Sequence, residues 1–239
     1  IYSVFHKWTG VIPEGFTLHN YVDLFTDSNF LASVGRSIGM CIIPIIVTII
    51  IVLLALFVTA IYFPKLEKYV QIICMIPYTI QGVILSVSIL SLYVGSSSIL
   101  SNRLVMLMGA YCIVILPYIY QGIRNGMRAV NMPTLIEAAE MLGASKIYAF
   151  FRVVVPNILS AIIVSSLLAV GIIFGDYVLI RNLAGTSAPN MQIFLYQTMK
   201  SDSTKASAVF VIIMFVTFVI TAIVLFVKSR EAKGKTHRK

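Results

Sequence analysis

The sequence predicts an all-α, polytopic membrane helix bundle, and three observations lead to this fold class. Of the 239 residues, 59% are hydrophobic and 11% are charged, with a mean hydropathy of +0.96, whereas a water-soluble domain carries about a quarter charged residues. Five apolar stretches each have roughly the 20 residues that a helix needs to cross a bilayer. The basic residues, which give a net charge of +9, stand in the breaks between these stretches. We therefore assign them to membrane-flanking positions and expect no nucleic-acid partner.

The first segment, 1–36, is expected to hold the end of a truncated first membrane helix and an external loop or short surface helix. Residues 1–5 are mostly apolar and resemble a helix end, and glycine and proline residues then precede the polar and aromatic string 17–25. With one further helix before residue 1, the N-terminus lies in the cytoplasm and the chain has six spans. We expect 1–239 to form a single transmembrane domain.

Three complete membrane helices are predicted within 37–123, at 37–63, 69–94 and 104–122. Pro44, Pro77 and Pro117 fall inside them, and they predict kinks rather than ends, because neighbouring helices can satisfy the carbonyls that proline frees. A weak repeat relates PYTIQG at 77–82 to PYIYQG at 117–122. Either the repeat is a coincidence, or its two copies form a gate of paired kinks toward the cytoplasmic side.

The break at 124–157 is too long for a simple connection. Thr134 follows Pro133 and stands three residues before Glu137, the spacing of a capping box, so a helix is expected to start there. Gly143 offers a helix end, and 145–151 is predicted to form a second short helix. The sequence therefore predicts a helical hairpin at the membrane surface.

Small and acidic residues mark one part of this hairpin. Ala138 and Ala139 permit close approach of a partner backbone, while Glu137 and Glu140 can meet its basic side chains. A hairpin that merely covers the membrane surface, with no partner, explains the same residues equally well.

Two further membrane helices are predicted at 158–180 and 206–227, and residues 228–239 form a basic, disordered tail. If this tail is cytoplasmic, twelve Lys and Arg residues lie inside and six outside, in agreement with the positive-inside rule. The inside set is Lys65, Lys68, Arg124, Arg128, Lys146, Arg152, Lys228, Arg230, Lys233, Lys235, Arg238 and Lys239, and the outside set is Lys7, Arg36, Arg103, Arg181, Lys200 and Lys205.

The hairpin residues resemble a family motif. Glu137-Ala138-Ala139, three residues, Gly143, nine residues, Val153, one residue, Val155 and Pro156 resemble the EAA loop of permease subunits from binding-protein-dependent ABC importers. That pattern reads EAA, three residues, G, nine residues, I, one residue, L, P. This chain departs from it by Val for Ile and Val for Leu.

The resemblance implies that the loop is a coupling helix, seated in a cleft of a separate cytoplasmic ATPase. It implies that Glu137 is the polar anchor, Ala138 and Ala139 the close-contact surface, and Gly143 the turn. The ATPase-coupling candidates are Glu137, Ala138, Ala139, Glu140, Gly143, Ala144 and Pro156.

The resemblance also implies the assembly around the chain. The expected partners are two ATPase subunits, a second permease subunit that is homologous or identical, an external solute-binding protein and the lipid bilayer. The expected location is the bacterial inner (cytoplasmic) membrane, with several spans and a cytoplasmic C-terminus. No GxxxxGK[ST] string occurs in the sequence, so ATP and Mg²⁺ are expected in the partner ATPase. We expect this chain to be no enzyme and to hold no cofactor or metal, since its cysteines and histidines stand apart.

A solute path needs polar groups inside the membrane. Asp176 is the one acid within a predicted membrane stretch, and such acids are usually functional, although a helix-terminal Asp paired with Arg181 is the alternative. Tyr177, Tyr118 and Ser88 are the other path candidates, unless they are interhelical hydrogen-bonding or interface residues.

Two segments bear on the cargo. FGDYVLIRNLAG (174–185) and QIFLYQTM (192–199) are more similar to the importer branch for spermidine/putrescine, iron, thiamine and aminophosphonates than to the maltose branch. This resemblance implies a polyamine-like small solute. Iron, thiamine, an aminophosphonate or a sugar stays an alternative cargo, and a secondary transporter or a membrane scaffold is an alternative class.

Overall fold

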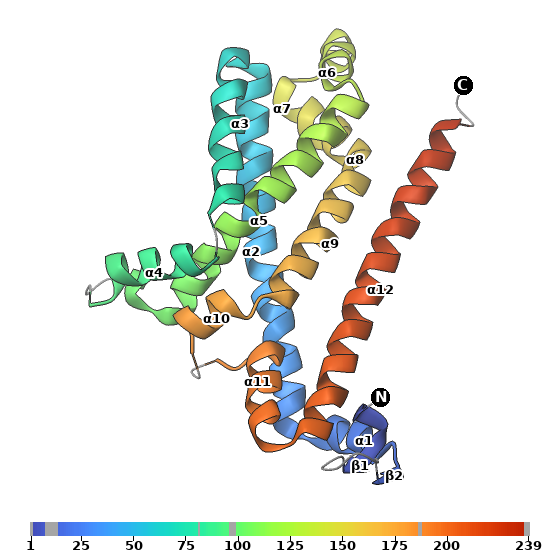
Figure 1. The fold of residues 1–239 in the computed structure, drawn as a ribbon. Helices are drawn as coiled ribbons and strands as arrows, with labels where there is room; N and C mark the ends of the chain where they lie inside the picture. Colours follow the sequence, from blue (N-terminus) through green and yellow to red (C-terminus); the bar gives the residue numbers. More distant parts are fainter. Residues whose placement is uncertain (1, 8–13, 81, 96–98, 186–187, 237–239) are drawn as a thin grey trace. The chain divides into compact units, whose positions relative to one another are not determined.

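The computed structural model describes residues 2–7, 14–80, 82–95, 99–185 and 188–236. It divides into two compact units, the first made of 1–42, 82–110 and 173–220 and the second of 43–81, 111–172 and 221–239. Four helices contribute to both units: α2 (Ser28–Ile61), α5 (Arg103–Ala129), α9 (Leu159–Gly175) and α12 (Ser203–Thr236) (Figure 1). The single domain expected for 1–239 stays a prediction.

The predicted fold class, an all-α polytopic membrane protein, is confirmed. Among the residues that the structure describes, three helices are long and apolar enough to cross a membrane, namely Ser28–Ile61, Arg103–Ala129 and Ser203–Ile223. The number reaches five if each of two bent pairs is one span. One pair is Pro64–Thr79 with Gly82–Tyr93, and the other is Lys146–Asn157 with Leu159–Gly175, bent by 65°. The predicted spans 37–63, 104–122 and 206–227 thus correspond to single helices, and 69–94 corresponds to the first bent pair. The predicted span 158–180 is wrong as one continuous helix, because α9 ends at Gly175 and α10 (Val178–Leu183) begins after a break at 176–177.

The first unit contains several short elements beside parts of the long helices. They are η1 (Tyr2–Val4), β1 (Phe5–Lys7), β2 (Glu14–Phe16), α1 (His19–Thr26), α4 (Gly82–Tyr93), η4 (Ile99–Ser101), α10 (Val178–Leu183) and α11 (Met191–Ser201). α4 packs on α10, where the Asn182 side-chain amide donates to the buried Ser86 hydroxyl at 2.8 Å. α2 is joined to the start of α11, because the buried Ser37 hydroxyl accepts from the Met191 N–H at 3.0 Å.

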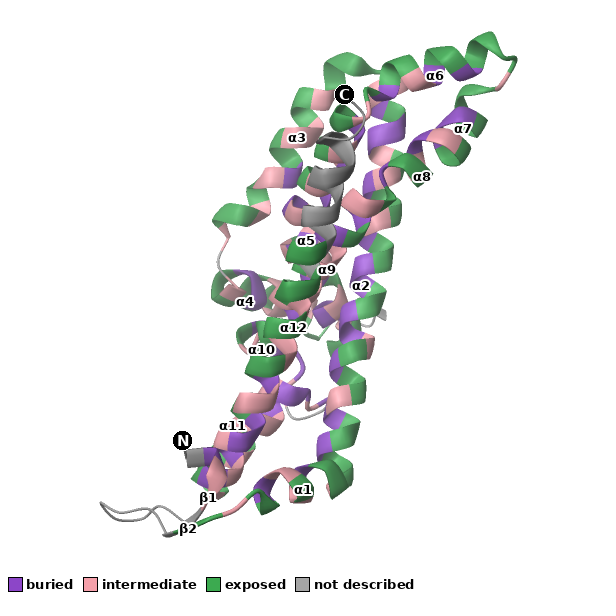
Figure 2. Cartoon of the chain, turned by 90° about the vertical axis from the view of Figure 1, so that its right-hand side faces the viewer, coloured by how far each residue is buried: buried purple, intermediate pink, exposed green. Residues whose placement is uncertain are grey.

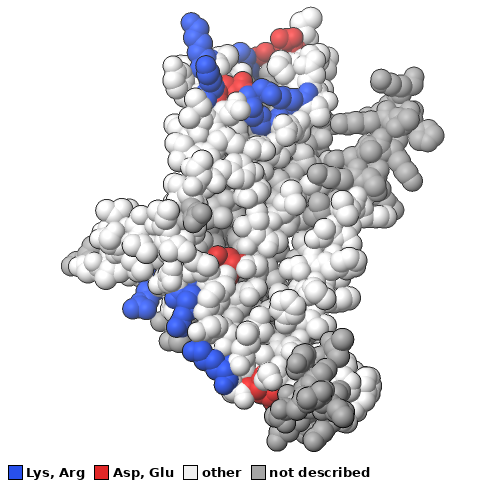
Figure 3. All heavy atoms as spheres, in the orientation of Figure 1, with Lys and Arg blue, Asp and Glu red and all other residues white. Residues whose placement is uncertain are grey.

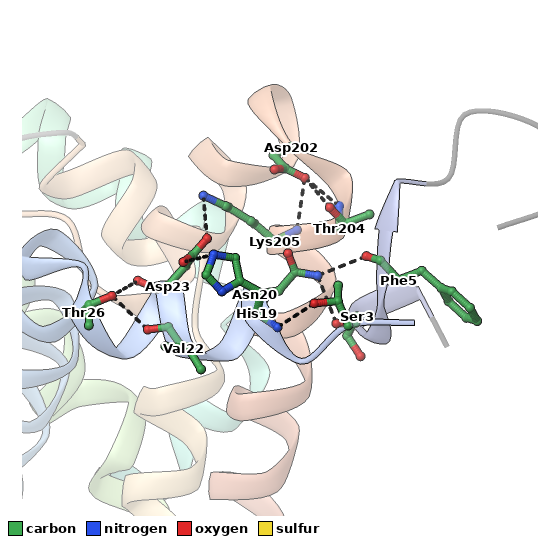
Figure 4. Close-up of polar contacts among 11 residues, drawn as sticks. Ser3, Phe5, His19, Asn20, Val22, Asp23, Thr26, Asp202, Thr204 and Lys205 are labelled. Atoms are coloured by element: carbon green, nitrogen blue, oxygen red, sulfur yellow. Dashed lines mark hydrogen bonds and ion pairs between the residues drawn. The ribbon is translucent and has the colours of Figure 1, made fainter. Parts of the chain in front are cut away.

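Polar contacts hold the N-terminal strand and α1 against the start of α12 (Figure 4). The Asn20 side-chain amide donates to the carbonyl oxygens of Ser3 and Phe5, at 3.2 and 3.1 Å. The Asp23 carboxylate forms an ion pair with Lys205 Nζ at 3.6 Å. The short surface helix expected in the first segment is therefore present as α1.

The second unit contains the remaining short helices. They are η2 (Pro64–Leu66), α3 (Glu67–Met75), η3 (Ile76–Thr79), α6 (Met132–Met141), α7 (Lys146–Ala149), the π-helical turn η5 (Phe150–Val154) and α8 (Val155–Asn157). α6 and α7 lie beyond the end of α5 (Figure 1). Ile115, Ile119 and Ile123 recur every four residues along α5 and are fully buried, as expected for one face of a packed helix.

The three prolines behave differently from one another. α2 continues through Pro44 and α5 continues through Pro117, so neither proline ends its helix, as predicted, and the kinks stay a prediction. Pro77 instead lies in η3, after which Ile80 is extended and α4 begins at Gly82. The predicted continuous helix 69–94 is therefore wrong, and the chain breaks where a proline and a glycine stand five residues apart. Gln81 lies outside the described residues.

Both ends of the chain differ from the expectation. Residues 2–7 form a 3-10 turn and the strand β1, which pairs antiparallel with β2, rather than the end of a membrane helix. α12 continues to Thr236, so the tail expected to be disordered from 228 is helical as far as that residue. Ile1, Gly10, Pro13 and 237–239 lie outside the described residues.

Candidate functional site

The first helix of the hairpin 131–157 is α6, which begins at Met132, two residues before the predicted start at Thr134, whereas α5 continues to Ala129, past the predicted start of the loop at 124. Asn131 has a left-handed backbone (φ 50°) and precedes the first helical residue, Met132, so that Pro133 occupies the first turn of α6. Proline is well tolerated there because the first N–H groups of a helix have no partner within it. No side chain caps α6, so the predicted capping box of Thr134 and Glu137 is wrong. The turn at Asn131 redirects the chain out of α5 instead.

The predicted helix end at Gly143 is confirmed. Gly143 has φ 84°, a left-handed conformation that glycine adopts at little cost. Its N–H donates to the Glu140 carbonyl at 2.9 Å, and the Ala144 N–H donates to the Ala139 carbonyl at 3.0 Å. This pair of hydrogen bonds is a Schellman motif, which gives the hairpin a defined turn.

The second half of the hairpin starts at Ser145, as predicted, and continues past 151. The Ser145 hydroxyl accepts from the Tyr148 N–H at 3.3 Å and caps α7. η5 and α8 then lead to α9, with Pro156 in α8. Phe150 is fully buried and its ring lies 4.9 Å from that of Phe57 on α2. The hairpin is therefore anchored to α2 by an aromatic contact.

The hairpin divides its predicted residues between an outer and an inner face (Figure 2). Glu137, Ala138 and Glu140 are exposed, and Ala139 is buried at 9% exposure. Ala139 thus packs inside the hairpin and its carbonyl closes the turn, so of the two alanines only Ala138 is exposed; the contact surface stays a prediction. Glu140 also forms a 3.8 Å ion pair with Lys146 across the turn.

Sequence reasoning missed two residues at the tip. Met141 and Leu142 are each 89% exposed, although large apolar side chains are ordinarily buried. Charged residues flank them, including Glu140 and Lys146. The tip therefore presents an apolar surface inside a charged border.

A charge cluster lies in the second unit beside the hairpin's supporting helices. The Arg124 guanidinium on α5 donates through Nε and Nη2 to Glu67 Oε1 on α3, at 2.8 and 2.7 Å, and Arg128 Nη2 lies 3.5 Å from the same oxygen. Arg124 is only 15% exposed. In Figure 3, the charged side chains of this unit gather toward α3, α6 and α7. The cluster ties α3 to α5 where the chain enters the hairpin.

α5 and α9 approach each other closely in the second unit. A Cβ added at Gly122 lies 2.3 Å from the Ser165 Cβ, and one added at Gly126 lies 2.6 Å from the Ala161 Cβ. The spacing of four residues on both helices is a small-xxx-small pattern, which lets membrane helices pack backbone to backbone. The spacing of small residues at 122 and 126 and at 161 and 165 is present in the sequence, but it was not part of the predicted site.

The predicted path residues fall into both units. Asp176, Tyr177 and Ser88 belong to the first unit and Tyr118 to the second. Asp176 lies between α9 and α10, where its carboxylate accepts from the Leu179 N–H at 3.1 Å. The helix-terminal part of the alternative for Asp176 is therefore supported, whereas its pairing with Arg181 stays a prediction.

The aromatic and serine candidates of the first unit lie in different settings. The Tyr177 ring lies 5.3 Å from that of Tyr196, and Lys200 Nζ lies 4.6 Å from the Tyr196 ring centre. Ser88 is exposed on α4, whereas its neighbour Ser86 is buried and bonded to α10. The structure thus brings Tyr177 into an aromatic and cationic cluster.

Tyr118 lines a groove in the second unit with a volume of about 420 Å³. Its ring meets that of Tyr78 edge to face, with the centres 4.9 Å apart, so the tyrosines at the second position of PYTIQG and of PYIYQG lie together. The lining is Tyr78, Tyr118, Gln121, Gly122, Asn125, Gly126, Ala129, Ala161, Val164, Ser165 and Leu168. Among the described residues, no cluster of His, Cys, Asp or Glu could hold a metal ion.

Comparisons with known proteins agree with this architecture. Over 239 aligned residues, the chain is 23% identical to the probable ABC transporter permease protein MG188 of Mycoplasma genitalium, with 89% of this chain and 72% of that protein covered. Two solved bacterial structures have a similar fold. A bacterial ABC transporter involved in the import of the acidic polysaccharide alginate gives a TM-score of 0.66 at 17% identity, with 97% of this chain and 86% of that one covered.

The second structure is a bacterial alginate ABC transporter in complex with an alginate pentasaccharide-bound periplasmic protein. It gives a TM-score of 0.65 at 18% identity, with 89% of this chain and 81% of that one covered. The family model for the binding-protein-dependent transport system inner membrane component matches residues 66–232, which is more than half of the chain. This multi-pass membrane protein therefore belongs to the family of binding-protein-dependent transport system inner membrane components, the permease subunits of ABC importers.

Proposed function

We propose that this permease forms part of a solute path through the bacterial cytoplasmic membrane and couples it to a separate ATPase through the hairpin 131–157. The observation that carries the proposal is the hairpin itself, with its fixed turn at Gly143, its exposed residues Glu137 and Ala138, and its anchor at Phe150. The proposal places the hairpin and the C-terminus in the cytoplasm, as the distribution of Lys and Arg favours.

The proposed assembly contains two ATPase subunits, a second permease subunit and an external solute-binding protein. The last is supported by the alginate transporter, whose structure contains a substrate-bound periplasmic protein. ATP and Mg²⁺ bind to the ATPase subunits. The ATPase binds the exposed side of α6, where Glu137 meets a basic residue and Ala138 permits close contact.

Packing in the second unit supplies the mechanical connection. α5 leads directly into the hairpin and α9 leads directly out of it, and these helices meet at Gly122 and Gly126 with almost no space between them. Close-packed interiors transmit displacement rather than absorb it. A shift of the hairpin therefore moves α5 and α9 together.

Coupling follows from the difference in affinity between states. ATP binding closes the ATPase dimer, and the two hairpins of the permease pair move with it. The membrane helices then change from an inward-facing to an outward-facing state, and hydrolysis resets them. Nucleotide and solute thereby bias the same equilibrium from two sites.

For the cargo we propose a polyamine-like cation, on the similarity of 174–185 and 192–199 to that branch of importers. Asp176 and Tyr177 supply a carboxylate and an aromatic ring in the first of these segments, and both attract cations. A sugar is the second candidate, favoured by the fold shared with two alginate transporters. Uptake assays with each class, using the cognate solute-binding protein, decide between them.

The coupling proposal is tested with the assembled importer in proteoliposomes. Gly143→Pro removes the N–H that closes the Schellman motif and cannot adopt φ 84°, so we expect ATP hydrolysis without uptake, or no assembly with the ATPase. Gly143→Asn is the matched control, since asparagine tolerates a left-handed backbone. Normal assembly and uptake with Gly143→Pro contradict the proposal. Uptake without any ATPase subunit points to a secondary transporter.

A further inference from the structure

We propose that the groove over the α5–α9 contact binds an ammonium group of the cargo, an inference that rests on the proposed solute path. The groove lies within the second unit and holds about 420 Å³. Its side chains come from η3, α5 and α9, two of which continue directly into the hairpin. A ligand bound here thus contacts the helices that the hairpin moves.

The floor of the groove is formed by small residues. Gly122 and Gly126 on α5 meet Ser165 and Ala161 on α9 with no room for an added Cβ on either glycine. The Ser165 hydroxyl donates to the Ala161 carbonyl at 2.9 Å, so this hydroxyl already has a hydrogen-bond acceptor within α9. The absence of longer side chains at this contact leaves the volume above it open.

The rim of the groove offers hydrogen-bond acceptors. The Gln121 amide nitrogen donates to Met75 Sδ at 3.1 Å, which leaves its carbonyl oxygen as the unused group. Asn125 is exposed, and its side chain forms no hydrogen bond with another residue that the structure describes. The carbonyl oxygens of these two side chains can both accept hydrogen bonds from a ligand that carries several N–H donors.

The aromatic part of the rim adds a preference for positive charge. Tyr78 and Tyr118 meet edge to face and both line the groove, and tyrosine rings attract cations through their negative faces. No Lys or Arg belongs to the described lining. Arg124, one residue before Asn125, is engaged with Glu67. An ammonium therefore meets rings and oxygen atoms without meeting a cation in the lining.

The test is equilibrium binding of labelled spermidine to the complete importer in lipid nanodiscs, with neither nucleotide nor solute-binding protein. Fully acetylated spermidine is the matched probe, because it keeps the chain and loses the ammonium groups. We expect spermidine to bind and the acetylated compound not to bind. Equal binding of the two compounds overturns the inference, as does binding of the acetylated compound alone.

Substitutions locate the site and test the sign of its charge preference. Asn125→Asp adds a carboxylate to the rim and should tighten spermidine binding by about fivefold or more, while Asn125→Lys should abolish it. Tyr118→Leu should weaken binding by about 2- to 30-fold, and Tyr118→Phe should keep most of it. Tyr69→Leu is the control, since Tyr69 is exposed on α3 and lies outside the lining.

Two outcomes separate this inference from the proposed function. Unchanged spermidine binding in both Asn125 variants, or an equal loss in Tyr69→Leu and Tyr118→Leu, overturns the ammonium site even if Gly143→Pro uncouples uptake of the true cargo. Binding that follows the expected pattern supports the site even if Gly143→Pro leaves uptake normal, because the binding assay requires no coupling.

Discussion

Replacing Gly122 with alanine tests the contact between α5 and α9 that we assign to the mechanical connection. The new Cβ lies 2.3 Å from the Ser165 Cβ and 2.8 Å from its Oγ, whereas carbon atoms prefer about 3.5–4.0 Å. The Ser165 Cβ is fixed to its backbone, so the two helices must move apart by about 1 Å or more. Overpacking of this kind costs about 1–3 kcal/mol.

Gly109→Ala is the matched control for this substitution. Gly109 lies on the same helix and has nothing within 4 Å of an added Cβ. Alanine favours a helix over glycine by about 0.5–1 kcal/mol, and this gain is common to both variants. The difference between the two variants therefore isolates the clash, and we expect Gly122→Ala to be about 1–3 kcal/mol less stable than Gly109→Ala.

The assay is thermal unfolding of the purified chain in mild detergent, where this difference corresponds to about 2–12 °C for a protein of this size. Ser165→Gly removes the clashing atoms and leaves the Ala161 carbonyl as the next neighbour, at 3.6 Å. The double variant Gly122→Ala/Ser165→Gly should therefore recover most of the lost stability. The close contact is refuted if Gly122→Ala and Gly109→Ala have the same melting temperature. It is also refuted if adding Ser165→Gly to Gly122→Ala restores none of the lost stability.

Glu137→Lys reverses an exposed charge of α6 and should reduce co-purification of the ATPase subunit. Thr134→Lys adds a cation to the same helix without removing Glu137, so it should reduce co-purification less. Equal co-purification with both variants argues against Glu137 as the anchor. Glu67→Ala leaves the poorly exposed Arg124 without its carboxylate and should cost about 1–3 kcal/mol in detergent unfolding, and an unchanged midpoint contradicts the contribution of this ion pair. Burial by itself raises the pKa of Asp202, but hydrogen bonds from the Thr204 hydroxyl and from the N–H groups of Lys205 and Thr204 outweigh it and hold the pKa below its ordinary value of 3.8. This contribution to stability is present above pH 3.8 and is lost as the pH falls through the lower folded-state pKa. Asp202→Asn should therefore flatten the acid limb of a plot of melting temperature against pH. An unaltered acid limb shows that these hydrogen bonds to Asp202 do not stabilise the fold.

The long membrane helices could be predicted because their signal is simple length and hydropathy. Ser28–Ile61, Arg103–Ala129 and Ser203–Ile223 overlap most of the predicted stretches 37–63, 104–122 and 206–227, and the first two continue through Pro44 and Pro117. The stretch 69–94 is also apolar but breaks before Gly82. In a bundle, proline and glycine can be either tolerated or used as a break, and hydropathy does not distinguish the two cases.

The hairpin was predicted in outline for a similar reason. Gly143 is a reliable end signal because its left-handed conformation is specific to few residue types, and the structure confirms it. The start was mistaken because Asn131 adopts φ 50°, which no spacing rule reveals. The exposure of Met141 and Leu142 depends on what the rest of the chain leaves uncovered, so it becomes visible only in the folded structure.

The groove combines residues that no local pattern joins. Tyr78 and Tyr118 are 40 positions apart, and their shared repeat was noted without any means to tell a contact from a coincidence. Gly122 closes the predicted stretch 104–122 and Gly126 falls in the predicted loop after it, so no single pattern joined the two glycines. Only the facing positions Ala161 and Ser165 give these glycines a role, and that pairing is a tertiary contact.

We propose that the ATPase binds the hairpin, and labelling a cysteine placed at Leu142 tests this most directly. A single cysteine at this position, with Cys41, Cys74 and Cys112 replaced by alanine, is exposed to a membrane-impermeant maleimide in inside-out vesicles. Our account predicts that the cysteine is protected while the ATPase subunits are bound and reacts rapidly once they are stripped away, whereas a cysteine at the exposed position Lys65 changes much less. Equal labelling of Leu142→Cys with and without the ATPase contradicts the account.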